Sequence, residues 1–94
     1  MSVRLERLVE IALRDVLDPE MGRSVVDLGL IYGISAASDA TVTVTMTTTT
    51  RGCPLAGFLK QAVALAAGAV EGVSAVEVVL VYEPAWQPAM VAAE

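Results

Sequence analysis

The sequence predicts a small α/β domain of the two-layer α+β kind, with the element order α-β-β-α-β. We expect a three-stranded mixed sheet with both helices packed on one face. The length predicts a single core, because 94 residues leave no room for a second one. Two segments repeat apolar residues at helical spacing, and a segment between them alternates between apolar and polar residues. Residues 1–94 are therefore treated as one domain, of which 84–94 form an extended C-terminal tail.

The first helix is expected to begin after Ser2, which can cap it, and to end at about Leu17. Pro19 disfavours helical backbone at Asp18, and Gly22 follows closely. Charged residues occupy the other side of the helix, as is typical of a solvated face. Its predicted apolar stripe consists of Leu5, Leu8, Val9, Ala12, Val16 and Leu17.

The loop after this helix carries two carboxylates, Asp18 and Glu20. One interpretation is structural: Asp18 accepts hydrogen bonds from the backbone of its own turn. The other is functional: the loop forms a polar lip beside a site. The sequence leaves both open.

The first strand is predicted within residues 24–34, with an irregular start, because Asp27 and Gly29 interrupt its apolar run. Regular pairing should begin near Leu30. Gly29 is expected to mark a bulge or a close approach of another backbone. Residues 35–40 are small and polar, which favours a hairpin loop.

The second strand has the clearest pattern in the chain. Val42, Val44 and Met46 alternate with threonines, which predicts a half-buried strand with one solvated face. We expect the threonine run that ends at Thr50 to continue this outer face into a loop.

A second helix is expected from Pro54 to a closing Gly72, followed by a third strand over residues 74–82 that Pro84 ends. The predicted apolar stripe of this helix consists of Leu55, Phe58, Leu59, Ala62, Leu65, Ala66, Ala69 and Val70.

The only cysteine, Cys53, lies between Gly52 and Pro54, where the second strand gives way to this helix. A sulfur at or next to the helix N-cap is surrounded by unpaired N–H groups at the positive end of the helix dipole. Both effects favour a reactive thiolate. The alternative is a small buried apolar cysteine, which is the commoner role of a lone cysteine.

Composition narrows the function classes. The net charge of −5 argues against a nucleic-acid partner, which requires a basic patch. No apolar run reaches membrane-spanning length, and no signal peptide pattern is present. An unpaired thiol suggests a reducing compartment, by default the cytoplasm. The absence of histidine excludes Cys-His nucleophile pairs within one chain and histidine-ligated metal sites.

If the second and third strands are parallel, four segments meet at one edge of the sheet: residues 18–29, 49–53, the start of the second helix, and 83–86. If they are antiparallel, Trp86 moves to the far edge. Trp86, the only tryptophan, either caps the edge of the core or shields Cys53 and anchors a partner.

Four motifs stand out along the chain: Asp18-Pro19-Glu20, Val26-Asp27-Leu28-Gly29-Leu30-Ile31-Tyr32, Thr49-Thr50-Arg51-Gly52-Cys53-Pro54-Leu55 and Pro84-Ala85-Trp86-Gln87-Pro88-Ala89-Met90. In order and spacing they resemble the MIP18-type family, also called DUF59 or iron–sulfur cluster assembly P, which includes SufT-like and PaaD-like proteins.

The resemblance implies an α/β fold and a role in delivering or inserting iron–sulfur clusters into client proteins. The resemblance places the reactive cysteine of the family, which would be the metal ligand, on Cys53. It places the acidic motif of the family on Asp18 and Glu20. Arg51 stands where family members commonly have proline. The cysteine-rich C-terminal extension of longer PaaD-like proteins is not seen, which favours a SufT-like role over maturation of a phenylacetate-degradation oxygenase. The supporting site edge would comprise Asp18, Glu20, Asp27, Thr50, Arg51, Gly52 and Trp86.

The leading hypothesis is therefore a non-enzymatic assembly factor whose partners are iron–sulfur assembly proteins and client apoproteins, with no nucleic acid and no membrane. A cluster usually needs about four protein ligands. One chain supplies one thiolate, so a transient cluster or iron would be shared with a homodimer mate or a client. A thiolate-dependent redox protein is the second hypothesis, weakened by the missing histidine and resolving cysteine. The third is a plain interaction module.

Overall fold

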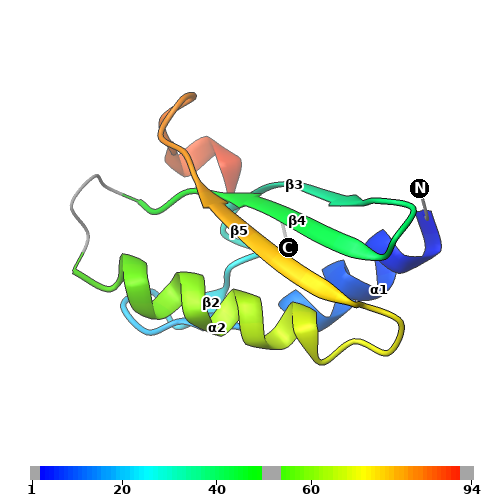
Figure 1. Ribbon diagram of the computed structural model, residues 1–94. Coiled ribbons are helices and arrows are strands. Elements are labelled where there is room, and N and C mark those ends of the chain that lie inside the picture. Colours follow the sequence, from blue (N-terminus) through cyan, green and yellow to red (C-terminus); the bar gives the residue numbers. More distant parts are fainter. Residues whose placement is uncertain (1–2, 50–53, 92–94) are drawn as a thin grey trace.

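The computed structural model describes residues 3–49 and 54–91. Its elements form two layers, with a sheet lying over two helices (Figure 1). Three of the described elements were not predicted: the two short strands that precede β3 and a 3₁₀ turn in the C-terminal tail. In chain order the elements are α1 (Val3–Leu13), β1 (Leu17–Asp18), β2 (Arg23–Ser24), β3 (Ile31–Ala36), β4 (Thr41–Met46), α2 (Ala56–Gly68), β5 (Ala75–Leu80) and the 3₁₀ turn η1 (Pro88–Met90).

The main sheet has the strand order β3-β4-β5. β3 and β4 are antiparallel, whereas β4 and β5 are parallel and are joined by the crossover through α2. This confirms the predicted mixed sheet. The parallel pairing of β4 and β5 is also the condition under which the sequence predicted that four segments meet at one edge of the sheet. The additional strands β1 and β2 form a short antiparallel pair, in which Leu17 lies opposite Ser24.

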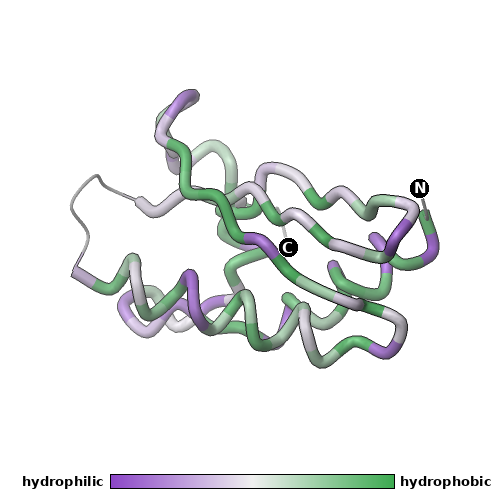
Figure 2. The backbone as a smooth tube through the Cα atoms, in the orientation of Figure 1, coloured by the Kyte–Doolittle hydropathy of each residue, from purple (hydrophilic) through white to green (hydrophobic). Residues whose placement is uncertain are grey.

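The core lies between the sheet and the helices. Val42, Val44 and Met46 of β4 are fully buried, and the threonines between them are half-buried, as the alternation predicted. Val44 pairs with Ile34 of β3 on one side and with Val78 of β5 on the other. The hydropathy-coloured tube shows apolar segments running along both helices and the strands (Figure 2).

The first helix is shorter than predicted. α1 ends at Leu13, and the next turn closes with bonds to the third residue back, from the Asp15 N–H to the Ala12 carbonyl and from Val16 to Leu13. The chain thereby leaves the helix before Leu17, which pairs in β1 and is 56% exposed. The placement of Leu17 in the apolar stripe of this helix was wrong.

The predicted stripe of the second helix was also partly wrong. α2 buries Leu59, Val63 and Ala67, whereas Phe58 and Leu65 are 58% and 68% exposed. Apolar residues occupy most sides of this helix, so their spacing does not select the face that packs on the sheet.

The ends of α2 differ from the prediction as well. The helix begins at Ala56, with Leu55 at its N-cap position, and ends at Gly68. The observed N-cap position is therefore Leu55, whereas the sequence predicted an N-cap at or next to Cys53. β3 begins at Ile31 and extends to Ala36, two residues into the predicted hairpin loop, and β5 is shorter than its predicted range. The tail contains the turn η1 within a segment that was predicted to be extended.

Neither α1 nor α2 combines the length and the apolar character needed to cross a membrane, and no other helix in the described residues does.

Candidate functional site

One edge of the sheet collects the segments that the sequence singled out. The register places Ile31, at the start of β3, beside Met46 at the end of β4, and Met46 beside Leu80 at the end of β5. The loops at residues 25–30, 47–49 and 81–86 therefore meet at this edge, which we call the loop edge (Figure 1). The opposite edge holds the 37–40 hairpin loop and the turn before β5.

The exit from β4 is enclosed rather than solvated. Thr47 and Thr48 are 0% and 1% exposed, so the expectation that the threonine run continues an outer face was wrong. The Thr47 N–H donates to the Leu30 carbonyl at 2.8 Å, and the Thr48 hydroxyl donates to the Tyr82 hydroxyl at 3.0 Å. β4 leaves the sheet between the ends of its two neighbouring strands, and the chain at those ends therefore buries Thr47 and Thr48.

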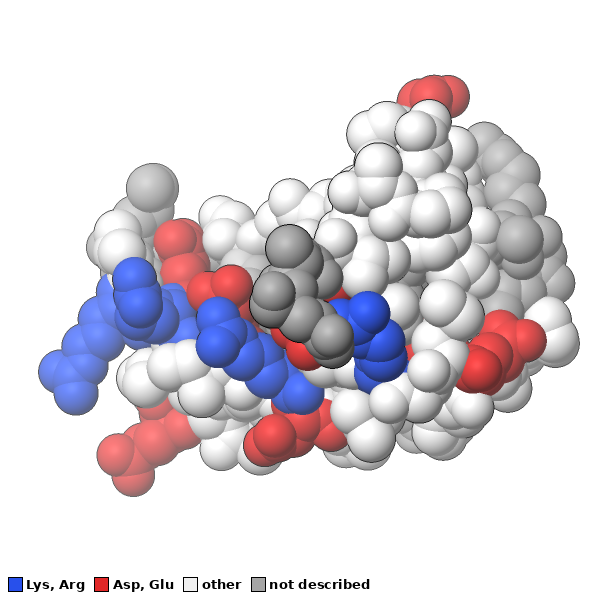
Figure 3. All heavy atoms as spheres, turned by 180° about the vertical axis from the view of Figure 1, so that it is seen from behind, with Lys and Arg blue, Asp and Glu red and all other residues white. Residues whose placement is uncertain are grey.

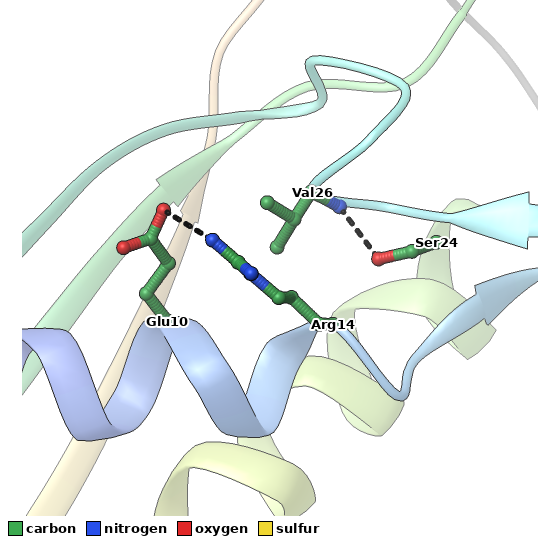
Figure 4. A network of polar contacts seen from close by, with 4 residues as sticks. All are labelled: Glu10, Arg14, Ser24 and Val26. Carbon is green, nitrogen blue, oxygen red and sulfur yellow. Dashed lines mark hydrogen bonds and ion pairs between the residues drawn. The ribbon is translucent and has the colours of Figure 1, made fainter. Parts of the chain in front are cut away.

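The turn over residues 25–30 is held by its own backbone. The Leu28 N–H donates to the Ser24 carbonyl at 2.9 Å, and the Leu30 N–H donates to the Val25 carbonyl at 3.0 Å. The Ser24 hydroxyl accepts the Val26 N–H at 3.1 Å, close to the Glu10–Arg14 ion pair of α1 (Figure 4).

Gly29 completes this turn with a φ of +76°, which favours glycine. A Cβ atom at Gly29 would collide with the Met90 carbonyl. The predicted close approach of another backbone is confirmed, and the approaching chain is the C-terminal segment.

Residues 84–91, which we call the C-terminal strap, fold back over this turn. The Trp86 indole N–H donates to the Leu28 carbonyl at 2.7 Å. The Tyr32 hydroxyl donates to the Pro84 carbonyl at 2.7 Å and lies 3.6 Å from the Met90 sulfur. Trp86 packs against the core, which supports its interpretation as a cap on the core's edge.

Asp18 serves its own turn. Its side chain is buried, and Oδ1 accepts the N–H groups of Glu20 at 2.8 Å and Met21 at 3.3 Å. This supports the structural interpretation of the acidic loop, since the bonding capacity of that oxygen is directed inward. The carboxylate-bearing residues Glu20 and Asp27 are exposed.

The central residues of the predicted site, Thr50, Arg51, Gly52 and Cys53, lie outside the described residues. The chain on either side of them is described: Thr49 is half-buried and Pro54 is exposed. The loop edge thus brings Asp27 and Trp86 into adjoining segments, whereas Asp18 and Glu20 belong to the separate β1–β2 turn.

Neither the role of Tyr82 nor the burial of Thr48 could be predicted from the sequence, because both residues fit the pattern of an ordinary strand. Tyr32 was part of a recognised motif, but its bond to Pro84 could not be read from that motif.

The donor groups among the described residues do not make a metal centre by themselves. Within 3–49 and 54–91, no group of three or more histidine, cysteine, aspartate or glutamate side chains could hold a metal ion. The whole sequence contains one cysteine and no histidine. An iron–sulfur cluster bound through this chain would take its other ligands from elsewhere.

The rear face of the molecule carries intermixed acidic and basic side chains (Figure 3). A hollow of about 370 Å³ lies between α1 and β3, and its lining includes Glu6, Arg7, Glu10 and Tyr32. Glu6 accepts the Ala36 N–H at 2.9 Å and so ties α1 to the end of β3.

The hairpin loop at the far edge holds an electrostatically perturbed group. The Thr41 backbone N–H, which donates to Asp39 at 3.0 Å, keeps the pKa of the Asp39 carboxyl below its usual value. This site is remote from the loop edge.

Comparison with known proteins gives consistent relatives. A maturation auxiliary factor for Fe-S proteins from Porphyromonas gingivalis is 44% identical over 82 residues, covering 87% of this chain and 78% of the relative. The Fe-S protein maturation auxiliary factor SufT from Staphylococcus aureus is 34% identical over 71 residues, covering 76% and 81%.

A solved DUF59 domain from Bacillus anthracis has a TM-score of 0.89 at 34% identity, covering 93% of this chain and 83% of that one. The sequence profile described as iron-sulfur cluster assembly protein matches residues 6–78. As the four motifs predicted, the chain belongs to the iron–sulfur cluster assembly protein family, DUF59.

Proposed function

We propose that this protein is an accessory factor in the maturation of iron–sulfur proteins, and that Cys53 makes its contact with the cluster, the iron or the client. The observation that carries the proposal is the family match over residues 6–78, together with relatives that are named as maturation auxiliary factors. Iron–sulfur assembly proteins and client apoproteins are the partners that this role requires.

The choice of Cys53 is supported by composition and by the described frame around it. It is the only thiol in the chain. The segments before and after it, the exit from β4 and the start of α2, leave from the loop edge, where Thr47 and Thr48 are buried.

A cluster handled by this protein is cargo rather than a resident cofactor. About four ligands are usual, and one chain offers one thiolate. A second chain or the client then supplies the remaining ligands, which suits a step in which the cluster is passed on.

We also propose that the protein is not an enzyme and that it acts in the cytoplasm. The chain has no histidine to activate Cys53 as a nucleophile and no second cysteine to resolve an oxidised one. The unpaired thiol favours a reducing compartment.

Anaerobic reconstitution with iron and sulfide tests the role of Cys53. Visible absorption and iron content are measured for the wild type, for Cys53→Ser and for Ser35→Ala, an exposed serine on β3 that serves as the control. We expect the wild type and Ser35→Ala to bind iron equally and Cys53→Ser to bind much less. Equal iron in all three proteins would remove Cys53 as a ligand.

The choice between a general iron–sulfur role and maturation of a phenylacetate-degradation oxygenase depends on the client. Purification of the protein with its bound partners from the native host, followed by identification of those partners, decides between them. Retention of every client by Cys53→Ala would instead favour a plain interaction module.

A further inference from the structure

A second groove lies on the helical layer, away from the loop edge. Its volume is about 530 Å³, and it runs between α1 and the turn that follows α2. Two of its apolar side chains, Leu8 and Ile11, are 39% and 52% exposed. We call it the α1 groove; its lining consists of Arg4, Leu5, Leu8, Ile11, Ala12, Asp15, Val70, Glu71 and Gly72.

Four of these residues form one stripe along α1. Arg4, Leu8, Ile11 and Asp15 follow one another at intervals of four, three and four residues, which places them on one side of a helix. Asp15 lies just beyond Leu13, but the Arg14 N–H to Glu10 carbonyl bond and the Asp15 N–H to Ala12 carbonyl bond continue the turning of the chain.

The stripe is symmetric about its midpoint. Leu8 and Ile11 flank the centre at equal spacing, and Arg4 and Asp15 flank it farther out, also at equal spacing. A second copy of the stripe laid antiparallel places Leu8 opposite Ile11, and Arg4 opposite Asp15. A twofold axis repeats each contact, so the Leu8–Ile11 contact and the Arg4–Asp15 charge pair each occur twice.

The two charges stand against the dipole of their own helix. Arg4 lies in the first turn of α1 and Asp15 just past its end, whereas a helix favours acidic groups at its start and basic groups at its end. Across the described residues, the ion pair that α1 forms joins Glu10 to Arg14, and Arg4 and Asp15 take part in none. Their placement is unfavourable in the single chain and complementary to a second one.

We propose that the α1 groove is the interface of a symmetric homodimer, in which two α1 helices pack antiparallel. The occupant is a second copy because the stripe reads basic, apolar, apolar, acidic. The same stripe running in the opposite direction sets each charge beside its opposite and each apolar side chain beside another. The paired charges also offset part of the repulsion between two chains that each carry a net charge of −5. This interface does not depend on the proposed function.

Sedimentation velocity over a range of protein concentrations tests the interface with three variants. Arg4→Asp sets two acidic groups opposite each other at each end, and Asp15→Arg sets two basic groups opposite each other. We expect each to weaken dimerisation by about tenfold or more, since two symmetry-related charge pairs become repulsive. The double variant exchanges both charges, restores the pairing and should dimerise like the wild type.

Arg7→Asp provides the matched control, because Arg7 is an exposed α1 residue outside this groove and the charge change is identical. It should leave the dimer unchanged. Circular dichroism checks that all variants keep their helices. A wild type that stays monomeric at every concentration would overturn the proposal, as would a double variant as weak as the single ones, or an effect of Arg7→Asp equal to that of Arg4→Asp.

Discussion

Replacing Gly29 with alanine should open the C-terminal strap. Gly29 has a φ of +76°, where an alanine costs about 1–2 kcal/mol. The added Cβ also meets the Met90 carbonyl, so the strap must move. If the Trp86–Leu28 hydrogen bond is lost with that movement, a further loss of about 1 kcal/mol follows. The expected total is about 2–3 kcal/mol, which lowers the Tm of a domain of this size by at least about 8 °C.

Gly22→Ala isolates the effect of the strap. Gly22 has a similar φ of +69°, but nothing lies within 4 Å of an added Cβ. Both substitutions reduce the freedom of the unfolded chain equally, so that contribution cancels in the comparison. Gly22→Ala should therefore lose only about 1–2 kcal/mol, the cost of the backbone conformation.

Urea unfolding measures the two stabilities, and the emission of Trp86, the only tryptophan, reports on the strap. In Gly29→Ala the Trp86 emission should shift to the red, and acrylamide should quench it more strongly. In Gly22→Ala neither property should change. Equal destabilisation in the two variants, with the same emission as the wild type, would refute the steric reasoning.

Three further predictions concern other polar groups. Thr48→Val and Tyr82→Phe each remove one hydroxyl of the 3.0 Å pair, so each should lower the free energy of unfolding by about 1–2 kcal/mol. Their double variant should lose less than the sum of the two, and additive losses in urea unfolding would contradict a direct coupling. Asp18→Ala removes the acceptor of two backbone N–H groups and should destabilise by about 1–2 kcal/mol. Asp27→Ala, which removes an exposed carboxylate, should have little effect, and similar losses in thermal unfolding would refute the structural role of Asp18. The carboxyl of Asp39 should titrate below its usual pKa in an NMR experiment, because the Thr41 N–H stabilises the charged form. Its contribution to stability is then present above the unfolded-state pKa and is lost as the pH falls through the folded-state pKa; a midpoint at or above the usual value would contradict it.

The sheet could be predicted from the sequence because the alternation of apolar and polar residues determines which face of a strand is buried. Val42, Val44 and Met46 repeat every second residue between threonines, so a single register satisfies the pattern. In the second helix no such contrast exists. Phe58, Leu65, Val63 and Ala67 are all apolar, and only packing against the sheet decides that the last two are buried.

The candidate site was predictable in its location but not in its contacts. The meeting of the loops follows from topology, once β4 and β5 are parallel. The bonds from Trp86 to Leu28 and from Tyr32 to Pro84 join residues that lie 58 and 52 positions apart, and no local pattern encodes them. Asp18 shows the opposite limit: the short turn suggested its backbone hydrogen bonds as one of two interpretations, but not that the side chain is buried.

The C-terminal strap also determines when the loop edge is completed during synthesis. The Leu28 carbonyl acquires its Trp86 partner only after 58 more residues have been made. At about 5–20 residues per second, the ribosome needs about 3–12 s for that stretch. Throughout this interval residues 25–30 exist without the segment that covers them in the folded domain. The loop edge is therefore the last part of the domain to be completed.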